Sequence, residues 1–306
     1  MKAARLHEFG SPLRIDDVPA PAPGPDEVLV RLTHAGVNPI DIRLRDGGAG
    51  RVELPFVPGC DGVGRADSGP VVVYGAGLGL RRAGTYAEQV AVPAKGVVRL
   101  PDGVDPVQAA GIGLAGVTAW ALVGRGVTAA DRVLVLGASG GVGSLAVQLA
   151  RSAGARVWAQ TTDPEDASRL DLGADRVVAC DAAGLRDAVR ELEPTVVLDG
   201  LGGAFTGAAV RAVANGGRIT VFGVSAGARG EVDYATLYRK SVTLYGHASL
   251  AMPAADVRDA LVGCLELVGA GQVRVLVDEV LPLGAVNAAH RRLTERRTTG
   301  KLVLAV

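Results

Sequence analysis

Residues 132–151 read RVLVLGASGGVGSLAVQLAR, and this stretch decides the fold. A short apolar run of strand length, Val133 to Leu136, leads into a glycine-rich turn from Gly137 to Gly143. Beyond the turn, apolar residues recur at the three- and four-residue spacing of a helix. A diphosphate can lie against such a turn, because no side chain intervenes and because the first N–H groups of the helix face the anion. The stretch therefore predicts a seat for a dinucleotide.

The segments that follow distinguish this interpretation from an ordinary strand-to-helix turn in some other α/β protein. The distinction is needed because Ala138 stands where the simplest G-x-G-x-x-G pattern has its first glycine, and a lone glycine turn is a weak signal. Strand-like and helical runs alternate after the turn, as in a doubly wound parallel sheet. The expected strands are Val133–Leu136, Arg156–Ala159, Arg176–Val178, Val196–Leu198, Arg218–Phe222 and Val242–Tyr245, and the expected helices cover 142–153, 164–172, 183–192 and 204–214.

The regions on either side of this alternation have a different texture. Residues 1–103 hold short apolar or alternating runs between turn residues, and closely spaced prolines near residues 19–25 exclude helix there, so this part is predicted to be β-rich and barrel-like. Residues 104–246 form the predicted nucleotide-binding domain. Residues 247–306 predict a helix at 254–268, a strand at 275–281, a helix at 283–294 and a last strand at 301–306. We expect this tail to return to the first domain.

Composition narrows the class of protein. The chain has 306 residues, which fits two domains, and its 32 Lys plus Arg equal its 32 Asp plus Glu. No summed field then favours nucleic acid or an anionic membrane. The N-terminal residues lack the apolar core of a signal peptide, and no run approaches the roughly 20 apolar residues that span a bilayer, so we expect a cytoplasmic protein. Cys60, Cys180 and Cys264 fit neither a disulfide framework nor a metal knuckle.

Several phrases, in order along the chain, point to one family. They are Gly36-Val-Asn-Pro-Ile-Asp41, Val57-Pro-Gly-Cys-Asp-Gly62, Gly84-Thr-Tyr-Ala-Glu88, Leu114-Ala-Gly-Val-Thr-Ala119, the turn at 137–143, Leu198-Asp-Gly-Leu-Gly-Gly203 and Thr298-Thr-Gly-Lys301. With them the chain resembles the medium-chain dehydrogenase/reductase superfamily, and within it the zinc-free quinone oxidoreductase (zeta-crystallin-like) branch. The resemblance implies a β-rich GroES-like barrel domain and a Rossmann-type parallel-sheet domain, with the reaction in a cleft between them.

The resemblance also assigns roles to individual residues. It implies that Asn38 lies beside the reacting carbonyl, where an amide N–H stabilises an oxygen that gains charge. On local sequence alone, a turn residue before Pro39 is an equally good interpretation of Asn38. Thr118 is implied to contact the nicotinamide amide. The implied cofactor-binding residues are Gly140, Gly141, Val142, Thr118, Thr161, Thr162, Gly200, Phe222, Gly223 and Arg296.

The residues also indicate whether the chain can bind zinc and which nicotinamide nucleotide it would use. Zinc-dependent relatives place a Cys at position 38 and a His at position 60, whereas this chain has Asn38 and Cys60 and shows no third ligand, so no metal is expected. Thr161 and Thr162 resemble the small polar pair of relatives that use NADPH, and Arg296 matches a phosphate contact. Acidic residues at 163, 165 and 166 would repel a 2′-phosphate. NADPH is the expected cofactor, with NADH as the alternative.

The reaction that follows is hydride transfer to a quinone or to an α,β-unsaturated carbonyl. Some enoyl reductases keep a tyrosine where this chain has Ala49, which favours a quinone-like acceptor and leaves an enoyl thioester reductase as the alternative. A catalytically vestigial nucleotide-binding sensor or nucleic-acid-binding protein is the other alternative, although only arginines 291, 292, 296 and 297 form a dense basic cluster. Relatives pair through the strand at 242–245, so a homodimer is expected.

Overall fold

The computed structural model describes residues 1–306, which divide into two units. Unit 1 comprises Met1–Val117 and Leu250–Val306, and unit 2 comprises Thr118–Ser249. The sequence placed the first boundary at 103/104, whereas the units divide inside helix α2 (Pro106–Gly124), which begins in unit 1 and ends in unit 2. The second boundary lies at 249/250 instead of 246/247.

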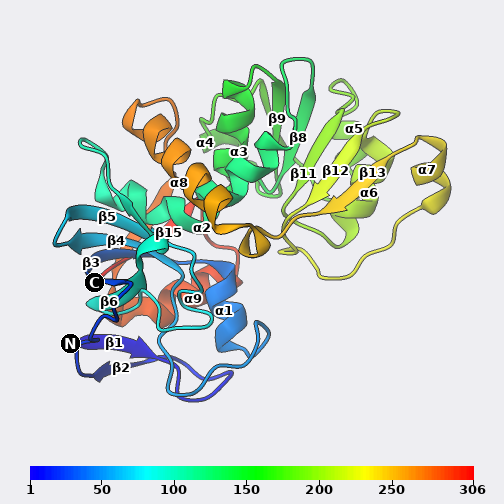
Figure 1. The fold of residues 1–306 in the computed structure, drawn as a ribbon. Helices are drawn as coiled ribbons and strands as arrows, with labels where there is room; N and C mark the ends of the chain where they lie inside the picture. Colours follow the sequence, from blue (N-terminus) through cyan, green and yellow to red (C-terminus); the bar gives the residue numbers. More distant parts are fainter. The chain divides into compact units, whose positions relative to one another are not determined.

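Unit 2 contains a parallel six-stranded sheet with the order β10-β9-β8-β11-β12-β13 (Figure 1). The strand order reverses between β8 and β11, which is the position where doubly wound folds bind nucleotides. In β8 every residue after the first is buried, as a continuous apolar run predicts. The strands are β8 (Arg132–Leu136), β9 (Arg156–Thr161), β10 (Arg176–Ala179), β11 (Val196–Asp199), β12 (Arg218–Val221) and β13 (Thr243–Gly246). The Rossmann-type fold class predicted from the sequence is confirmed.

The helices of unit 2 depart from the prediction in their lengths. They are α3 (Gly141–Ser152), α4 (Pro164–Arg169), α5 (Leu185–Ala188), α6 (Ala204–Ala212) and α7 (Tyr234–Arg239). Helix α4 stops early because Leu170 adopts an extended conformation, and α5 is a single turn instead of the expected ten residues at 183–192. Helix α7 was not predicted; its N-terminus is capped by Asp233, whose side chain accepts a hydrogen bond from Thr236 N. A core of buried residues such as Leu134, Leu198 and Ile219 holds the sheet to its helices.

Unit 1 is built on a seven-stranded sheet with the order β14-β15-β3-β4-β5-β7, in which β6 also pairs with β3. Only β14 and β15 run parallel. The strands are β3 (Glu27–Gly36), β4 (Asp61–Ala66), β5 (Gly69–Tyr74), β6 (Gln89–Pro93), β7 (Val97–Arg99), β14 (Val277–Pro282) and β15 (Lys301–Ala305), with β1 (Lys2–Arg5) and β2 (Arg14–Asp17) in a separate hairpin. This is the GroES-like domain that the resemblance implied.

Helices in unit 1 carry the chain past this sheet. Helix α1 (Pro39–Arg45) was missed by the strand-dominated prediction; it starts with a proline at its first position, where the missing N–H is harmless. After the short 3₁₀ helix η2 (Ser249–Ala251), α8 (Ala254–Gly269), η3 (Leu283–Ala285) and α9 (Val286–Thr294) fill the C-terminal tail, and η1 (Ala94–Gly96) precedes β7. The tail joins the sheet through β15, which pairs antiparallel with β3.

Helix α2 corrects one expectation. It is 19 residues long with a mean hydropathy of 1.5, so it meets the length and composition of a membrane-spanning helix, although the sequence was interpreted as having no such run. Of its most apolar window, 61% is buried inside the protein. A helix that is apolar on all sides is also what a buried core position requires.

Candidate active site

The glycine turn presents free donors at the start of α3. Gly137 has φ +72°, a left-handed conformation that favours glycine, and it turns the chain directly after β8. Gln160 fastens the start of this turn, since its Oε1 accepts from Gly137 N at 3.1 Å and its backbone oxygen accepts from Ala138 N at 2.8 Å. Gly140 is the N-cap of α3, and no side chain caps the helix. The first-turn N–H groups of Gly141 and Val142 therefore lack a protein acceptor, as helix geometry dictates.

Two glycines of the turn are needed for different reasons. A Cβ on Gly143 would lie 2.3 Å from Gly137 O and 2.9 Å from Ala138 Cα, so packing of the turn requires glycine there. A Cβ on Gly140 would meet only Gly137 O at 3.4 Å. The fold by itself tolerates a side chain at Gly140, and the open space beside uncapped helix donors fits a diphosphate. Gly140, Gly141 and Val142, all predicted cofactor residues, follow one another at the start of α3.

A second glycine loop lies at the same end of the sheet. Residues Asp199 and Leu136 are paired in register, so β11 and β8 end side by side. Gly200, Phe222 and Gly223 come together where β11 and β12 end: a Cβ on Gly200 would lie 2.8 Å from the Phe222 ring, and one on Gly223 would lie 2.5 Å from Gly200 O. The structure thus groups these three predicted cofactor residues.

Asp199 is a buried residue that sequence reasoning did not single out. Its Oδ1 accepts from Leu201 N and Gly202 N, each at 2.9 Å, and its Oδ2 accepts from the Thr206 hydroxyl at 2.6 Å. The carboxylate thereby fixes the path of the loop after β11. The phrase Leu198-Asp-Gly contained the signal, because an acidic residue at a strand end can hold the following N–H groups.

Thr118 is buried, and its hydroxyl donates to Ser249 Oγ at 2.8 Å. These residues are the first and last of unit 2. Ser249 had no sequence signal, since it lies 131 residues along the chain from Thr118. The hydroxyl pair holds the two ends of the unit together, and an oxygen of the pair is suited to bind a carboxamide.

The end of β9 carries the residues that bear on the cofactor's 2′ position. Thr161 is buried and Thr162 is exposed. Asp163 caps α4 by accepting from Glu165 N, and the Glu165 carboxylate pairs with Arg169. The remaining acid of this segment has a different position: Asp166 Oδ2 lies 3.5 Å from Thr161 Oγ1. A carboxylate therefore stands beside the strand end even though β9 itself ends in threonine.

Arg296, the last predicted cofactor residue, is an exposed residue of unit 1 just after α9, with φ +55°. It belongs to a different unit from Thr161, the predicted cofactor residue at the end of β9. Of the basic cluster around it, Arg292 pairs with Asp278 and Glu279, and Arg297 pairs with Glu295. Acidic neighbours thus balance much of this charge.

In unit 1, the predicted catalytic residue Asn38 lies in a buried polar group, which we call the Asn38 cluster: Asn38, Cys60, Asp61 and Lys301. Asn38 Oδ1 accepts from Lys301 Nζ at 2.6 Å, and Nδ2 donates to Asp61 Oδ1 at 2.8 Å. The second Nδ2 contact is to Cys60 Sγ at 3.5 Å. All four side chains are less than 5% exposed. Asn38 is the N-cap of α1, and its amide contacts the other three side chains of the cluster.

The surroundings of Asp61 explain why glycines recur near it. A Cβ on Gly36 would lie 2.5 Å from Asp61 Oδ1, and one on Gly113 would lie 2.3 Å from Asp61 Cβ. Asp61 Oδ2 accepts from Leu114 N at 2.8 Å. The carboxylate is thus packed closely against backbone atoms, and each of its oxygens accepts a hydrogen bond. Lys301 stood in the phrase Thr298-Thr-Gly-Lys301 without a role of its own, and Gly113 was not singled out, because their contacts depend on segments far apart in the chain.

A second polar group, formed by Asp41, Tyr86 and His290, lies in the core of unit 1. Asp41 Oδ2 accepts from Asn38 N at 2.9 Å and from the Tyr86 hydroxyl at 2.8 Å, whereas Asp41 Oδ1 has no partner. Burial, together with the charge of Asp61, raises the pKa of Asp41 to about 7. Burial, with a smaller contribution from Arg45, lowers the pKa of His290 to about 4. Asp41 is therefore protonated and neutral below about pH 7, whereas His290 is neutral above about pH 4.

The residues present do not fit a zinc ion. No group of three His, Cys, Asp or Glu side chains is placed to hold a metal, whereas a catalytic zinc takes three protein ligands and an open position. Asn38 Oδ1 is already occupied by a lysine ammonium, which would repel a cation. Burial, followed by the charges of Asp41 and Asp61, raises the pKa of the Cys60 thiol well above its usual range, so this thiol is uncharged in the cluster.

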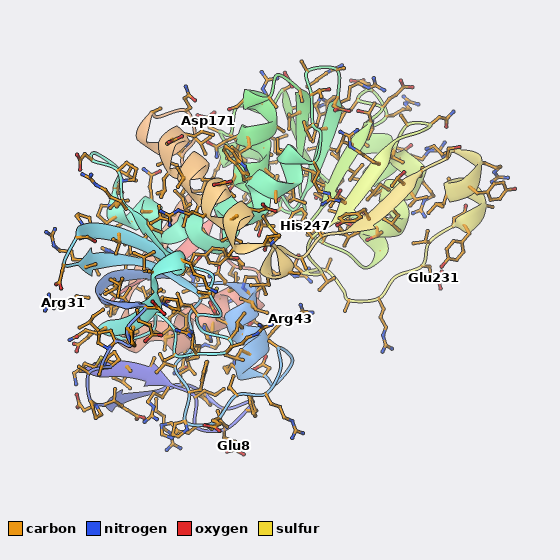
Figure 2. The ribbon with its side chains drawn as sticks, in the orientation of Figure 1. Glu8, Arg31, Arg43, Asp171, Glu231 and His247 are labelled. Carbon is orange, nitrogen blue, oxygen red and sulfur yellow. The ribbon has the colours of Figure 1, made fainter.

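His247 follows β13 directly (Figure 2). Its backbone N–H donates to Val221 O at 2.8 Å, and its Nε2 is buried without a partner. Burial, followed by the charge of Arg125, lowers its pKa, so the ring is neutral near pH 7. Cys180 follows β10 and is half-buried; burial, followed by the charge of Asp181, raises the pKa of its thiol.

Comparison with known proteins places these features in a family. A model described as an alcohol dehydrogenase GroES-like domain matches residues 24–102, and one described as a zinc-binding dehydrogenase matches residues 172–304. A quinone oxidoreductase of Pseudomonas aeruginosa is 30% identical, over 99% of this chain and 99% of its own length. The chain belongs to the medium-chain dehydrogenase/reductase superfamily. Within this superfamily it is quinone oxidoreductase-like, as the sequence phrases predicted.

Solved structures of the superfamily share the whole fold. A protein described as an NAD-dependent alcohol dehydrogenase has a TM-score of 0.91 and 33% identity, with 100% of both chains covered. A mycobacterial protein solved in complex with NADPH has a TM-score of 0.90 and 31% identity, again with 100% of both chains covered. Medium-chain dehydrogenase/reductases are oxidoreductases, and the residues at the glycine turn of this one fit a nicotinamide nucleotide.

Proposed function

We propose that the protein reduces a quinone or an α,β-unsaturated carbonyl with NADPH and without a metal. The observation that carries the proposal is the uncapped start of α3 at the reversal of strand order, with open space at Gly140. A reduced nicotinamide nucleotide supplies a hydride when bound. The relatives named quinone oxidoreductase support this acceptor class, and the NADPH-bound relative supports the cofactor.

The protein's own residues have defined tasks in this proposal. Gly141 and Val142 donate backbone N–H groups to the diphosphate, and the Thr118–Ser249 pair binds the carboxamide. Asn38 donates from Nδ2 to the substrate oxygen as charge develops there, which lowers the barrier to hydride arrival. The proton that completes reduction of a quinone comes from solvent, so no acidic side chain is required at this position.

Absence of a metal in the proposal rests on the Asn38 cluster. The two positions that zinc-dependent relatives give to Cys and His hold an amide bonded to Lys301 and Asp61, and a lone thiol. Polarisation of the substrate then comes from N–H donors. A nucleic-acid-binding role is disfavoured because the arginines near residue 296 have acidic partners of their own.

We also propose that a second copy of the chain pairs along β13. This strand is the edge of the sheet in unit 2, and each of its residues is exposed. Leu244 is 40% exposed and Tyr245 is 42% exposed. An open, partly apolar edge strand invites pairing, because the N–H and C=O groups on its outer side have no neighbouring strand.

The reaction is tested by mixing purified protein with NADPH or NADH and a panel of quinones, enones and enoyl thioesters while following absorbance of the reduced nicotinamide. Saturable oxidation with a quinone or enone is expected, with a lower KM for NADPH than for NADH. No turnover with any acceptor would refute the proposed reductase activity. Turnover with enoyl thioesters alone would identify the protein as an enoyl thioester reductase instead.

A further inference from the structure

An asparagine amide has two edges with opposite chemistry, and the Asn38 cluster decides which edge lies where. Oδ1 can only accept hydrogen bonds, and Nδ2 can only donate them. Lys301 Nζ, which only donates, lies 2.6 Å from Oδ1, and the Asp61 carboxylate, which accepts, lies 2.8 Å from Nδ2. If the amide were flipped, Nδ2 would face the ammonium and Oδ1 would face the carboxylate. Both contacts would become repulsive, so the cluster permits one orientation.

Lys301 is built into the fold for this position. It is the first residue of β15, and it follows Gly300, whose φ of +96° turns the chain into the strand. Val37 N donates to Leu302 O at 3.0 Å, which places the start of β15 beside the residues that lead into α1. Lys301 Nζ also donates to Val37 O at 2.9 Å. One ammonium thus holds both the backbone before Asn38 and the side chain of Asn38.

In this orientation one N–H of the amide has only a weak hydrogen-bond acceptor. Nδ2 has two hydrogens, of which one is donated to Asp61 and the other points to Cys60 Sγ at 3.5 Å. A thiol sulfur is a weak acceptor, so an oxygen that gains negative charge can take this N–H at little cost. The flipped amide would offer an acceptor instead, which would repel such an oxygen.

We propose that Lys301 is a positioning residue that, together with Asp61, holds the Asn38 amide so that an Nδ2 hydrogen is available to the substrate oxygen. The inference rests on the proposed function of Asn38, because the orientation matters for catalysis only if the amide contacts substrate. Whatever the role of Asn38 in catalysis, Lys301 sets the orientation and hydrogen bonding of the Asn38 amide.

The state of the amide can be measured without activity. The chain contains three asparagines, Asn38, Asn215 and Asn287, so selective labelling with ¹⁵N-asparagine gives three side-chain NH₂ signals. The Asn38 signal is assigned by its loss in Asn38→Ala. We expect it to exchange slowly with solvent in the wild type, and in Lys301→Met to shift and exchange at least about tenfold faster because its oxygen has lost its donor. Lys301→Arg, which keeps a cationic donor, should restore the slow signal.

A matched control separates this role from general stability. Lys240 also donates its ammonium to backbone carbonyls, those of Arg211 and Val213, but in unit 2. Lys240→Met therefore removes the same kind of contact elsewhere, and it should lower the melting temperature while leaving the Asn38 signal unchanged. Lys301→Leu, which also lacks a donor, serves if Lys301→Met does not fold. An Asn38 signal that is unaltered in the Lys301 variant would overturn the proposal, whatever the enzyme turns over.

Kinetics then test the link to catalysis. Lys301→Met should lower kcat by roughly tenfold to a hundredfold, within the range for loss of an oxyanion donor, while the Kd for NADPH stays within about twofold because the nucleotide seat is in unit 2. In an Asn38→Ala background, Lys301→Met should have no further effect on kcat. A full additional loss there would show that Lys301 acts independently and would overturn the positioning role. A wild-type kcat in Asn38→Ala alone would instead refute the function proposed for Asn38.

Discussion

Two glycines in the same turn offer a paired test of the nucleotide seat. In Gly143→Ala the new Cβ would lie 2.3 Å from Gly137 O, well inside normal contact with backbone that has no room to move. Overpacking of this kind costs about 1–3 kcal/mol. For a unit of this size, about 2 kcal/mol lowers the melting temperature by roughly 5–10 °C. In Gly140→Ala the nearest atom lies at 3.4 Å, so the fold accommodates the methyl group.

Binding should separate the two variants in a different way. The methyl group in Gly140→Ala occupies the space beside the first-turn N–H groups of α3, so a diphosphate is pushed away from them. Loss of charge-assisted hydrogen bonds to these donors costs about 1.5–3 kcal/mol, or roughly a tenfold to hundredfold rise in Kd. The melting temperature of the same variant should stay within about 2 °C of the wild type, because lower unfolded-state entropy offsets poorer capping.

The assay is NADPH titration followed by nucleotide fluorescence or calorimetry, with thermal unfolding of each apo variant beside it. Gly140→Ala should be stable and bind weakly, whereas Gly143→Ala should lose stability as well as binding. Tight NADPH binding by a stable Gly140→Ala variant would refute the placement of the diphosphate at this turn.

Further substitutions test the remaining features. Asp166→Asn removes the carboxylate beside Thr161, so the Kd for NADPH should fall about tenfold in low salt while that for NADH changes little; equal changes for both would contradict the placement of the 2′-phosphate. Asp41 has its pKa raised from 3.8 to about 7, so its contribution to stability is fully present below pH 3.8 and is lost as pH rises towards 7. His290 has its pKa lowered from 6.5 to about 4, so its contribution is present above pH 6.5 and is lost as pH falls towards 4. Asp41→Asn should therefore make the free energy of unfolding rise with pH relative to the wild type, by up to about 1.4 kcal/mol per unit between about pH 4.5 and 6.5; parallel curves from chemical denaturation would contradict the neutral state of Asp41. Leu244→Asp on β13 should halve the mass measured by light scattering at micromolar concentration, and a wild-type monomer would exclude the pairing.

The sequence was most informative where one local pattern dictates structure. The run at 133–136 and the glycines after it specified strand, turn and helix, and each expected strand of unit 2 is present in the sheet. Alternating apolar runs and turn residues also indicated the β-rich unit. Burial of continuous apolar strands between helices leaves few other arrangements.

Local pattern failed where tertiary contacts decide. The segment at 183–192 has helical composition, yet α5 stops after one turn, and α1 and α7 are short helices that depend on their caps. Pro39 indicated a break in a strand-rich region, but equally a first helical position. Helix α2 shows the same limit, because apolarity on all sides describes a core helix and a membrane span alike.

The candidate site was predicted in part for the same reason. Gly140, Asn38 and Thr118 were named as candidates through motifs and resemblance, whereas Lys301 stood in a family phrase without a role and Ser249 was not singled out. Each of these two meets its partner over more than a hundred residues of chain, 263 residues for Lys301 and Asn38 and 131 for Thr118 and Ser249. The polar partners of a buried side chain follow from strand pairing, which no single stretch of sequence contains.

The central claim is hydride transfer polarised by N–H donors in place of a metal ion. Its most direct test is NADPH oxidation by a quinone, measured with protein dialysed exhaustively against a strong chelator and confirmed to be metal-free by elemental analysis. The rate should equal that of untreated protein and should not rise when zinc is restored. Loss of turnover on chelation and its recovery with zinc would contradict the account.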